Sequence, residues 1–350
     1  MRKGSTGSST ACRSGRKKLL VLAPNWIGDV VMATPFLALL RKYNPDDFIT
    51  VLCRDYVSEL LRRSAFIDDL ITYRRDGGVT KAILALRARR PDQGWDASFL
   101  LPVSFSSALV AYLGGTTRRI GYRGNGRDWL LTDPITPQDH RKIHLSSEYA
   151  ALAGQYSGAG EEVLPAPCVI PPYDWKRRLE SFGLGGSYAV FAAGAAYGPA
   201  KVWPAERFAK LAARLKSEEG LRTVTVGSAK EEKYLDNITG TDEDALNLAG
   251  RSCIGDLMSI LRGAAIVVGN DSGPVHVSAA MGVPTVSIFG STSPVWTAPA
   301  GLRARTVASG ADCSPCFRKE CPEGDTRCLR DITVDEVFDA AVEILREKRQ

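Results

Sequence analysis

The chain has 350 residues, 44% of them hydrophobic, so it can bury one large core or two medium ones and is not a disordered protein. Its 45 Lys and Arg residues against 39 Asp and Glu residues give a formal net charge of +6. Much of this excess lies in three basic stretches, at residues 2–18, 87–90 and 118–141. A basic N-terminal half favours an anionic partner, although a solvated charged surface would have the same composition.

The sequence excludes several classes of protein. No helix-turn-helix, zinc-finger or RNA-binding signature accompanies the charge, so we expect no nucleic-acid partner, and an acidic lipid or sugar phosphate remains. No apolar run reaches the roughly 18 residues that a membrane-spanning helix needs. Residues 1–18 lack the apolar core of a signal peptide and are predicted to be a disordered tail. We therefore expect a cytoplasmic protein with at most peripheral membrane contact.

Apolar runs alternate with helical periodicity from residue 19 onward. The predicted strands cover 19–24, 49–54, 69–73 and 97–102, and the predicted helices cover 28–43, 57–64, 80–90 and 104–114. This repetition predicts an α/β fold with a parallel sheet that has helices on both faces.

A stretch rich in proline, at 164–175, interrupts the pattern, and such composition is typical of linkers. The alternation then restarts, with strands predicted over 187–194, 222–228, 265–270 and 284–290 and helices after Pro204, over 255–264 and from Ser272. Two Rossmann-like domains, 19–170 and 171–350, are the simplest organisation. A last helix over 334–347 could pack on either.

The loop after the first strand contains Asn25, Trp26, Gly28 and Asp29. In an open α/β sheet, ligands bind at the carboxyl ends of the strands, so this loop is expected to face a cleft. Gly28 allows close backbone approach, and the Asp29 carboxylate lies in the first turn of the next helix. It is a candidate catalytic base, or alternatively only a helix cap.

In the second half, Asn270, Asp271, Ser272 and Gly273 join a strand to a helix, and His276 follows one turn later. Unpaired backbone N–H groups and the helix dipole at such a site could bind a donor diphosphate without a metal. The alternatives are an ordinary N-cap and a packed helical histidine.

Two further strand-end loops belong to the same edge. Lys201 follows the strand at 187–194 and could neutralise charge on a leaving phosphate, unless it is a solvated surface lysine. Ser291 and Thr292 follow the strand at 284–290 and add hydroxyl groups for a donor.

Basic side chains in the first half form a candidate acceptor surface with a binding role and not a catalytic one. They are Arg118, Arg119, Arg123, His140 and His144.

Four cysteines, Cys313, Cys316, Cys321 and Cys328, lie within sixteen residues, the first two as C-x-x-C. This spacing suits a tetrahedral zinc site made of four thiolates, which would be structural because no coordination position stays open. Two disulfides or free thiols are the alternatives.

Other chemistry is disfavoured. The sequence has no P-loop, no nucleophile elbow and no H-E-x-x-H motif. The glycines at 121–126 do not join a strand to a helix as a dinucleotide site requires. The D-x-D string at 242–244, a form that metal-dependent sugar transferases use, lies in a polar stretch and is interpreted as surface charge.

Six motifs taken in order resemble the bacterial lipopolysaccharide heptosyltransferases, particularly heptosyltransferase II. They are PNWIGD, LLPVSFSSAL, RIGYRG, GAAYGPAKVWP, GNDSGPVHVSAAMGVP and FGSTSP, and the likeness runs from about residue 19 to the C-terminus.

The resemblance implies a GT-B fold, an ADP-heptose donor, and as acceptor a heptose on the Kdo-lipid A inner core of lipopolysaccharide. It also implies inversion without a catalytic metal or other cofactor. Asp29 matches the family's catalytic base, Lys201 its phosphate-contacting lysine, and Asp271 to Gly273 with His276 its donor loop. An inverting transferase needs one carboxylate to take the acceptor's proton, and the acidic acceptor suits a basic N-terminal half. The oligomeric state is not indicated.

Two departures bear on the donor. The family's loop commonly reads P-G-A-E where this chain has residues 193–196 as Ala-Gly-Ala-Ala, and an acid that some members use on the adenosine ribose has no clear match in 227–232. A sibling that adds the first heptose, a transferase for another nucleotide sugar, and an inactive sugar-nucleotide-binding protein therefore remain alternatives.

Overall fold

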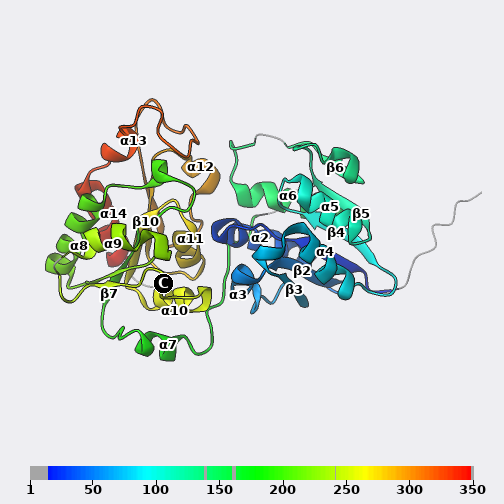
Figure 1. The fold of residues 1–350 in the computed structure, drawn as a ribbon, viewed down its shortest axis with the longest axis horizontal. Helices are drawn as coiled ribbons and strands as arrows, with labels where there is room; N and C mark the ends of the chain where they lie inside the picture. The colour runs from blue at the N-terminus through cyan, green and yellow to red at the C-terminus, as the bar shows by residue number, and fades with distance from the viewer. Residues whose placement is uncertain (1–14, 138–139, 160–162, 241, 348–350) are drawn as a thin grey trace, which may run out of the picture.

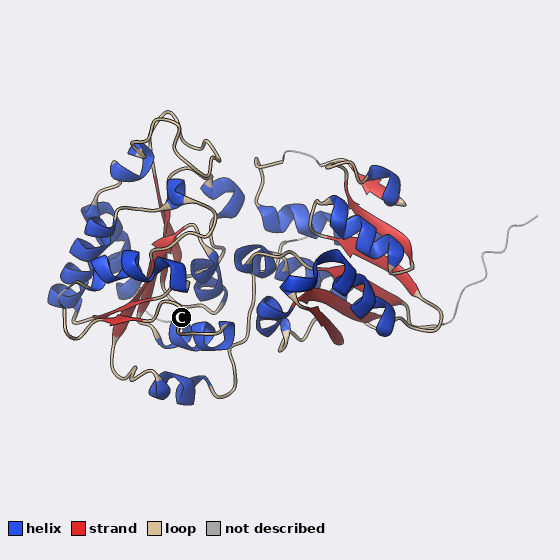
Figure 2. Cartoon of the chain, viewed as in Figure 1, coloured by secondary structure: helices blue, strands red, loops and turns tan. Residues whose placement is uncertain are grey.

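The computed structural model describes residues 15–137, 140–159, 163–240 and 242–347 and consists of two α/β halves (Figure 1). Each half contains a six-stranded parallel sheet with helices on both sides (Figure 2). The α/β class predicted from the alternation of strand and helix patterns is confirmed. In the described part of the chain, no helix is long and apolar enough to cross a membrane.

The first sheet has the strand order β3-β2-β1-β4-β5-β6. Its strands are β1 Lys18–Leu22, β2 Phe48–Arg54, β3 Asp69–Tyr73, β4 Trp95–Leu100, β5 Thr116–Tyr122 and β6 Asp133–Ile135. β1 pairs with both β2 and β4, so the strand order reverses beside it. Such a reversal opens a crevice at the carboxyl ends of the strands, and the loop after β1 lies there.

Residues 1–14 of the predicted disordered tail lie outside the described residues, but residues 16–18 are ordered on the sheet. Arg16 forms an ion pair with Asp68, and the Lys17 amide donates to Asp47. The tail prediction was therefore too long at its C-terminal end.

The helices of the first half cover both faces of the sheet. They are α1 Ile27–Met32, α2 Thr34–Tyr43, α3 Ser58–Leu61, α4 Gly78–Ala88, α5 Phe105–Leu113 and α6 Leu145–Ser157, with short 3₁₀ turns η1 Asp55–Val57, η2 Arg75–Gly77 and η3 Asp128–Leu130. The single helix predicted over 28–43 is in fact two, because Pro35 has no N–H to donate to the carbonyl of Val31. The Thr34 hydroxyl donates to that carbonyl instead, at 2.7 Å.

The second sheet has the order β12-β11-β10-β7-β8-β9. Its strands are β7 Tyr188–Ala192, β8 Arg222–Thr225, β9 Leu246–Asn247, β10 Ile266–Asn270, β11 Thr285–Phe289 and β12 Ala304–Ala308. β7 pairs with both β8 and β10, so the loops after β7 and β10 flank the reversal of strand order. These are the loops that carry Lys201 and Asp271.

The second half is completed by a further set of helices. They are α7 Trp175–Ser181, α8 Ala205–Glu219, α9 Glu232–Thr239, α10 Ile254–Gly263, α11 Gly273–Ala280, α12 Pro294–Thr297, α13 Arg327–Arg330 and α14 Val334–Arg346, with 3₁₀ turns η4 Pro199–Lys201 and η5 Ala229–Glu231. A capping box between Thr333 and Glu336 starts the last helix. α14 packs on α8, β11 and β12, so it belongs to the second half.

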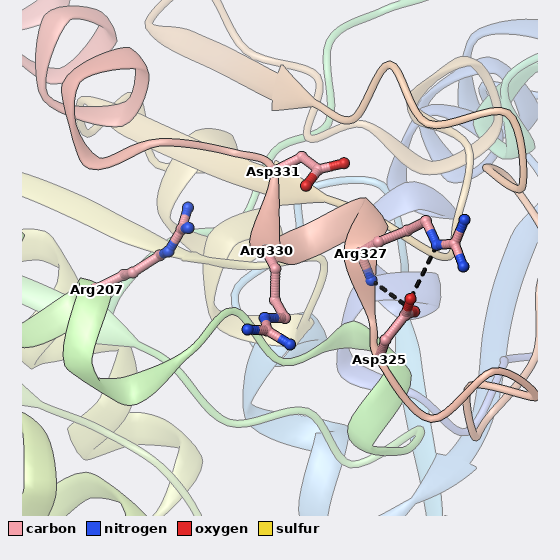
Figure 3. A pocket seen from close by; sticks show the side chains of 5 residues that line it. All are labelled: Arg207, Asp325, Arg327, Arg330 and Asp331. Carbon is pink, nitrogen blue, oxygen red and sulfur yellow. Dashed lines mark hydrogen bonds and ion pairs between the residues drawn. The ribbon is translucent and has the colours of Figure 1, made fainter.

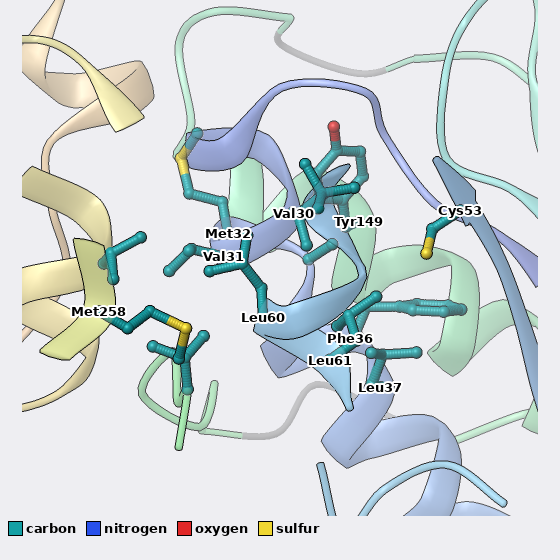
Figure 4. Packing of buried hydrophobic residues seen from close by; sticks show 14 of the residues in the cluster. Val30, Val31, Met32, Phe36, Leu37, Cys53, Leu60, Leu61, Tyr149 and Met258 are labelled. Carbon is teal, nitrogen blue, oxygen red and sulfur yellow. The ribbon is translucent and has the colours of Figure 1, made fainter. Parts of the chain in front are cut away.

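The two halves are joined by a continuous apolar cluster. α1 packs against α11, and α3 packs against α10. Figure 4 shows Met258 of α10 lying beside the helices that carry Val31, Met32 and Leu60 of the first half. Burial of these side chains between the halves favours a closed arrangement.

A buried arginine holds two strand-end loops of the first half together. Arg127 is fully buried, and no carboxylate in the described chain forms an ion pair with it. It donates to the Tyr122 carbonyl at 2.7 and 2.9 Å, to the Ser107 hydroxyl at 3.0 Å, and to the Pro102 carbonyl. Burial lowers the pKa of Arg127 to about 10, so the side chain stays protonated at neutral pH.

We expect Arg127→Met to destabilise the protein strongly, because it leaves buried carbonyl groups without a donor. The expected loss is about 3 kcal/mol, at about 1–3 kcal/mol for each unsatisfied group. This loss would lower the Tm by roughly 4 °C in a thermal melt followed by circular dichroism. Arg89→Met is the control, since Arg89 forms only an exposed ion pair with Asp69, worth less than about 1 kcal/mol. Equal losses in the two variants would contradict the assigned role.

Candidate active site

The site is formed where the N-terminal ends of α1 and α11 meet, and two glycines permit the close approach. A Cβ on Gly28 would lie 2.8 Å from His276 Cδ2, and a Cβ on Gly273 would lie 2.7 Å from Ile27 Cβ. Real side chains do not tolerate such distances, so each half supplies one position that only glycine fills without a shift. Gly28 and Gly273 thus have a packing role in bringing Asp29 close to Asp271.

Asp29 lies in the first turn of α1, as predicted, and faces the second half. In the described chain, its carboxylate makes no hydrogen bond or ion pair. Burial raises the pKa of Asp29 to about 6; His276 and Lys201 lower it in part, and the charge of Asp271 raises it further. The carboxyl group is therefore available as a base near neutral pH.

Asp271 is the opposite case, because its buried carboxylate is fully engaged. It accepts hydrogen bonds from Lys201 Nζ at 2.5 Å and from the Thr292 hydroxyl at 2.7 Å, and His276 Nε2 lies 3.6 Å from its other oxygen. Burial alone would raise the pKa of Asp271, but His276 and Lys201 together lower it to about 2. Asp271 therefore stays ionised and holds Lys201 and His276 in place.

The two carboxyl groups have pKa values displaced in opposite directions by their surroundings. Asp29 has no partner and Asp271 has several, so at neutral pH Asp29 can exchange a proton and Asp271 cannot. Such divergence between neighbouring acids is typical of active sites.

The N-terminus of α11 presents unused hydrogen-bonding groups. The Ser272 residue occupies the N-cap position, yet its hydroxyl does not cap the helix. The hydroxyls of Ser272 and Ser291 are both buried and have no partner in the structure. Buried polar groups are rarely left unpaired, so these two hydroxyls, one at the N-terminus of α11 and one in the loop after β11, suit an anionic ligand such as a phosphate.

Two residues predicted to contact the donor are instead occupied within the protein. The Asn270 side chain accepts from the Trp203 amide at 3.0 Å and donates to the Ala193 carbonyl, tying the loop after β7 to β10. The Thr292 hydroxyl donates to Asp271. Both side chains are buried and support the site from within the protein.

Asn25 and Trp26 lie at the entrance to the site, beside Asp29. Trp26 is the N-cap residue of α1 and is more than half exposed. The Asn25 carbonyl accepts from the Tyr56 hydroxyl in the loop after β2. Both therefore lie at the carboxyl edge of the first sheet, where an acceptor would approach.

The predicted basic surface does not form as one group. Arg118 pairs with Asp133 at 2.6 Å and stacks on Tyr156, near the N-terminal ends of β5 and β6. Arg119 donates to backbone carbonyls of the loops around β5. Arg123 alone follows the carboxyl end of its strand, at the edge where the Asp29 loop lies. The prediction failed for Arg118 and Arg119 because adjacent residues of a strand point to opposite faces.

The two predicted histidines bridge the halves. His144 caps α6 through Nδ1 and donates from Nε2 to the Ala298 carbonyl at 2.9 Å, and burial lowers its pKa, which keeps it neutral. His140 packs edge-on against Trp296 of α12. Arg141, which lies between them in the sequence, stacks on Trp296 as well.

Two further residues near the site were not predicted. Tyr149 of α6 is buried, and its pKa is raised well above the usual range by burial and by the nearby Asp29 charge. The Glu231 carboxylate lies against the loop after β7, since a Cβ on Gly194 would meet Glu231 Oε1 at 2.0 Å. Its other oxygen accepts from Ser228. An acid that follows the second strand of a Rossmann-like unit was the signal available in the sequence.

The cysteine-rich loop packs against the donor side of the site. Ser314 donates to the Gly290 carbonyl at 2.6 Å, and the Phe317 amide donates to the Ser291 carbonyl at 2.7 Å. The Ala200 amide donates to the Lys319 carbonyl at 3.1 Å. The loop therefore braces both Lys201 and Ser291.

The prediction that Cys313, Cys316, Cys321 and Cys328 hold a metal is not supported. Among the residues that the structure describes, no group of three or more His, Cys, Asp or Glu side chains is arranged to hold a metal ion. The four cysteines are free thiols. Cys328 is buried in α13 against Gly290, whereas Cys313 is exposed, and the backbone hydrogen bonds of the preceding paragraph hold the loop.

A hollow of about 300 Å³ lies elsewhere in the second half, lined by Arg207, Asp325, Arg327, Arg330 and Asp331 (Figure 3). Its charges are largely balanced within the lining, since Arg327 pairs with Asp325 and Arg207 donates to the Ile332 carbonyl. None of the residues around Asp29 and Asp271 lines it. We therefore place the site at the α1–α11 junction, where unpaired groups converge.

The chain is similar to lipopolysaccharide heptosyltransferases in sequence and in structure. The chain is 30% identical over 343 residues to lipopolysaccharide heptosyltransferase 2 of Escherichia coli (strain K12), covering 92% of this chain and 97% of that protein. The solved structure of E. coli ADP-heptose LPS heptosyltransferase II matches with a TM-score of 0.79 and 28% identity, over 94% of this chain and 98% of that one.

A glycosyltransferase family 9 structure from Veillonella parvula DSM 2008 has the same fold, with a TM-score of 0.81, 24% identity and coverage of 95% and 98% of the two chains. The predicted GT-B fold is thereby confirmed. Residues 83–326 match the family described as "Glycosyltransferase family 9 (heptosyltransferase)". The chain belongs to glycosyltransferase family 9, the heptosyltransferases.

Proposed function

We propose that the chain transfers heptose from ADP-heptose to a heptose of the lipopolysaccharide inner core, with inversion and without a catalytic metal. The observation that carries this proposal is Asp29, a half-buried and unpaired carboxylate opposite the N-terminus of α11. The two E. coli relatives named above are heptosyltransferases of lipopolysaccharide, and one of them is named as an ADP-heptose enzyme. We assign acceptor binding to residues 19–170 and nucleotide binding to residues 171–350.

The proposed reaction uses one base and one anion site. Asp29 takes the proton of the acceptor hydroxyl while that oxygen attacks the anomeric carbon of the donor. The bond from this carbon to the ADP oxygen breaks on the opposite face, so the configuration inverts. Lys201 and the N-terminus of α11, with the hydroxyls of Ser272 and Ser291, stabilise the negative charge of the departing ADP.

The remaining donor contacts follow from the second half. The Glu231 carboxylate has one oxygen free beside the loop after β7, which is where an acid binds ribose hydroxyls in Rossmann-like units. We therefore assign the adenosine ribose to Glu231. This supplies a carboxylate that residues 193–196 lack, and it supports a nucleotide donor.

The acceptor is assigned to the edge of the first sheet. Asn25 and Trp26 lie there in the loop that carries Asp29, and Arg123, which follows the carboxyl end of β5, is exposed and pairs with Asp128 at 3.3 Å. Because the acceptor is a lipid, we propose that the chain works in the cytoplasm and binds peripherally to the inner membrane.

A transfer assay tests the function directly. The protein is incubated with ADP-heptose and heptose-Kdo-lipid A, and mass spectrometry is expected to show the acceptor with one added heptose. Product on Kdo-lipid A alone would assign the first-heptose activity instead. Product from a different nucleotide sugar would change the donor, and binding of ADP-heptose without product would contradict the catalytic role.

Asp29→Asn is expected to lower kcat by about a hundredfold or more, because the base is lost, while ADP affinity stays nearly unchanged. In the unmodified protein, kcat/KM should fall by about tenfold per pH unit below the Asp29 pKa of about 6, since the raised pKa keeps the carboxyl protonated there. Initial rates against pH measure both effects. Asp55→Asn, an exposed acid after β2, is the matched control. Retention of normal turnover by Asp29→Asn would remove the assignment.

Lys201→Met is expected to weaken ADP binding by about tenfold or more, since a hydrogen bond to a charged group is worth about 1.5–3 kcal/mol. Calorimetric titration with ADP measures the Kd. The double variant Lys201→Met with Asp271→Asn removes the uncompensated Asp271 charge and should bind ADP as weakly as the single variant. Recovery of affinity in the double variant would show that Lys201 only neutralises Asp271. Lys210→Met, on the exposed face of α8, is the control.

A further inference from the structure

The outer face of α5 is apolar although it faces solvent. The nine residues Phe105–Leu113 contain no charged side chain. Phe105, Leu109 and Tyr112 are spaced by four and three residues, so they share one stripe of the helix, and Ala108 and Ala111 are buried on the other side. A soluble surface helix normally has polar residues on such a stripe.

Neighbouring elements extend this stripe. Trp129 of η3 is 71% exposed, and its ring centroid lies 6.1 Å from that of Phe105. α4 packs beside α5 and adds an exposed leucine. We define the α4–α5 patch as the exposed apolar side chains Leu84, Val103, Phe105, Tyr112, Leu113 and Trp129. Contiguous apolar surface of this kind marks an interaction site.

The surroundings of the patch are basic. Arg87, Arg90 and Arg119 lie beside it without an acidic partner in the described chain, whereas the other basic side chains of residues 78–127 are paired with acids or, for Arg127, buried. Arg87 donates to the Leu113 carbonyl at 2.9 Å, and Arg90 lies against Gly115. Neither arginine forms an ion pair within the described chain. Arg119 stacks on the Tyr112 ring at 5.3 Å.

The patch lies beside the proposed acceptor edge. One face of the first sheet carries the apolar cluster that continues into the second half. α4 and α5 cover the opposite face (Figure 1). Val103 and Trp129 follow the carboxyl ends of β4 and β5. In a parallel sheet these ends share one edge, so this end of the patch lies on the edge that carries Asp29.

We propose that the α4–α5 patch docks the chain on the surface of an anionic lipid bilayer. Aromatic and aliphatic side chains enter the interface, and Arg87 and Arg90 contact the headgroups. Two copies of this chain would instead bring like charges together, which disfavours self-association through the patch. The inference deepens the proposed function, because a lipid-linked acceptor would then lie at the edge that carries Asp29.

Vesicle sedimentation tests the proposal. The protein is expected to pellet with vesicles of equal parts phosphatidylglycerol and phosphatidylcholine, and much less with phosphatidylcholine alone. The variant Phe105→Ser/Trp129→Ser should reduce partition by about tenfold or more, since both anchors are lost. Arg87→Gln/Arg90→Gln should reduce it several-fold and weaken its dependence on salt.

Matched controls remove equally exposed groups elsewhere. Tyr173→Ser/Leu302→Ser changes two side chains that are at least as exposed, and Arg177→Gln/Arg346→Gln removes two exposed arginines of the second half. Both should pellet like the unmodified protein. Thermal melts check that every variant is folded.

The outcomes separate the docking surface from the transfer activity. Patch variants should keep normal transfer to a deacylated, soluble acceptor and lose transfer to vesicle-embedded acceptor. No pelleting of the unmodified protein, or equal pelleting of patch and control variants, would overturn the proposal. A dimer that dissociates only in the aromatic variant, without vesicle binding, would assign the patch to a second copy. Vesicle binding through the patch without transfer to any acceptor would leave it standing and refute the proposed function.

Discussion

The close approach of α1 and α11 is the constraint on which the site depends. Gly28 and Gly273 are each in contact with the other half, against His276 and Ile27, and a methyl group at either position would push the helices apart. Because both helices begin at this contact, their N-termini and the strand-end loops before them converge. Asp29 is thereby half-buried without being paired, since its neighbours across the contact are themselves held by Asp271. The packing of two helices and the pKa of a carboxyl group are consequences of the same geometry.

Asp271 holds together the part of the site that belongs to the second half. A buried carboxylate needs partners, and it obtains them from η4, α11 and the loop after β11, which are distant in sequence. Lys201 and His276 are thus fixed before a donor arrives, so little ordering remains to be done on binding. Asn270 does the same for the backbone, by joining the loop after β7 to β10. Asn270 and Asp271 are neighbours in one loop, yet Asn270 fixes backbone and Asp271 fixes side chains.

The sequence predicted the central strands and the strand-end loops, because buried parallel strands are continuous apolar runs and ligands bind at their carboxyl ends. It did not predict β5, β6, β9 or β12. Thr116–Tyr122 contains two arginines, and β6, β9 and β12 lie at sheet edges and are only partly buried, so none has an apolar run. For the site, residue type and position gave Asp29, Lys201 and Asp271. Which groups pair with one another depends on contacts across the fold. The sequence therefore did not show that Thr292, Asn270 and Arg118 bond to other residues of the protein.

The same limit applies to α5. Its composition predicts a helix, and an uncharged helix in a two-domain protein is normally buried on all sides. Only the contacts of the folded chain show that α4 and α5 form the outer layer, with Phe105 and Tyr112 left in solvent. An exposed apolar surface of this kind lowers solubility unless a partner binds to it. The arginines beside it favour an anionic partner. A lipid surface there and a base at the adjoining sheet edge would place the reacting hydroxyl of a membrane-anchored sugar within reach of Asp29 without the lipid leaving its bilayer.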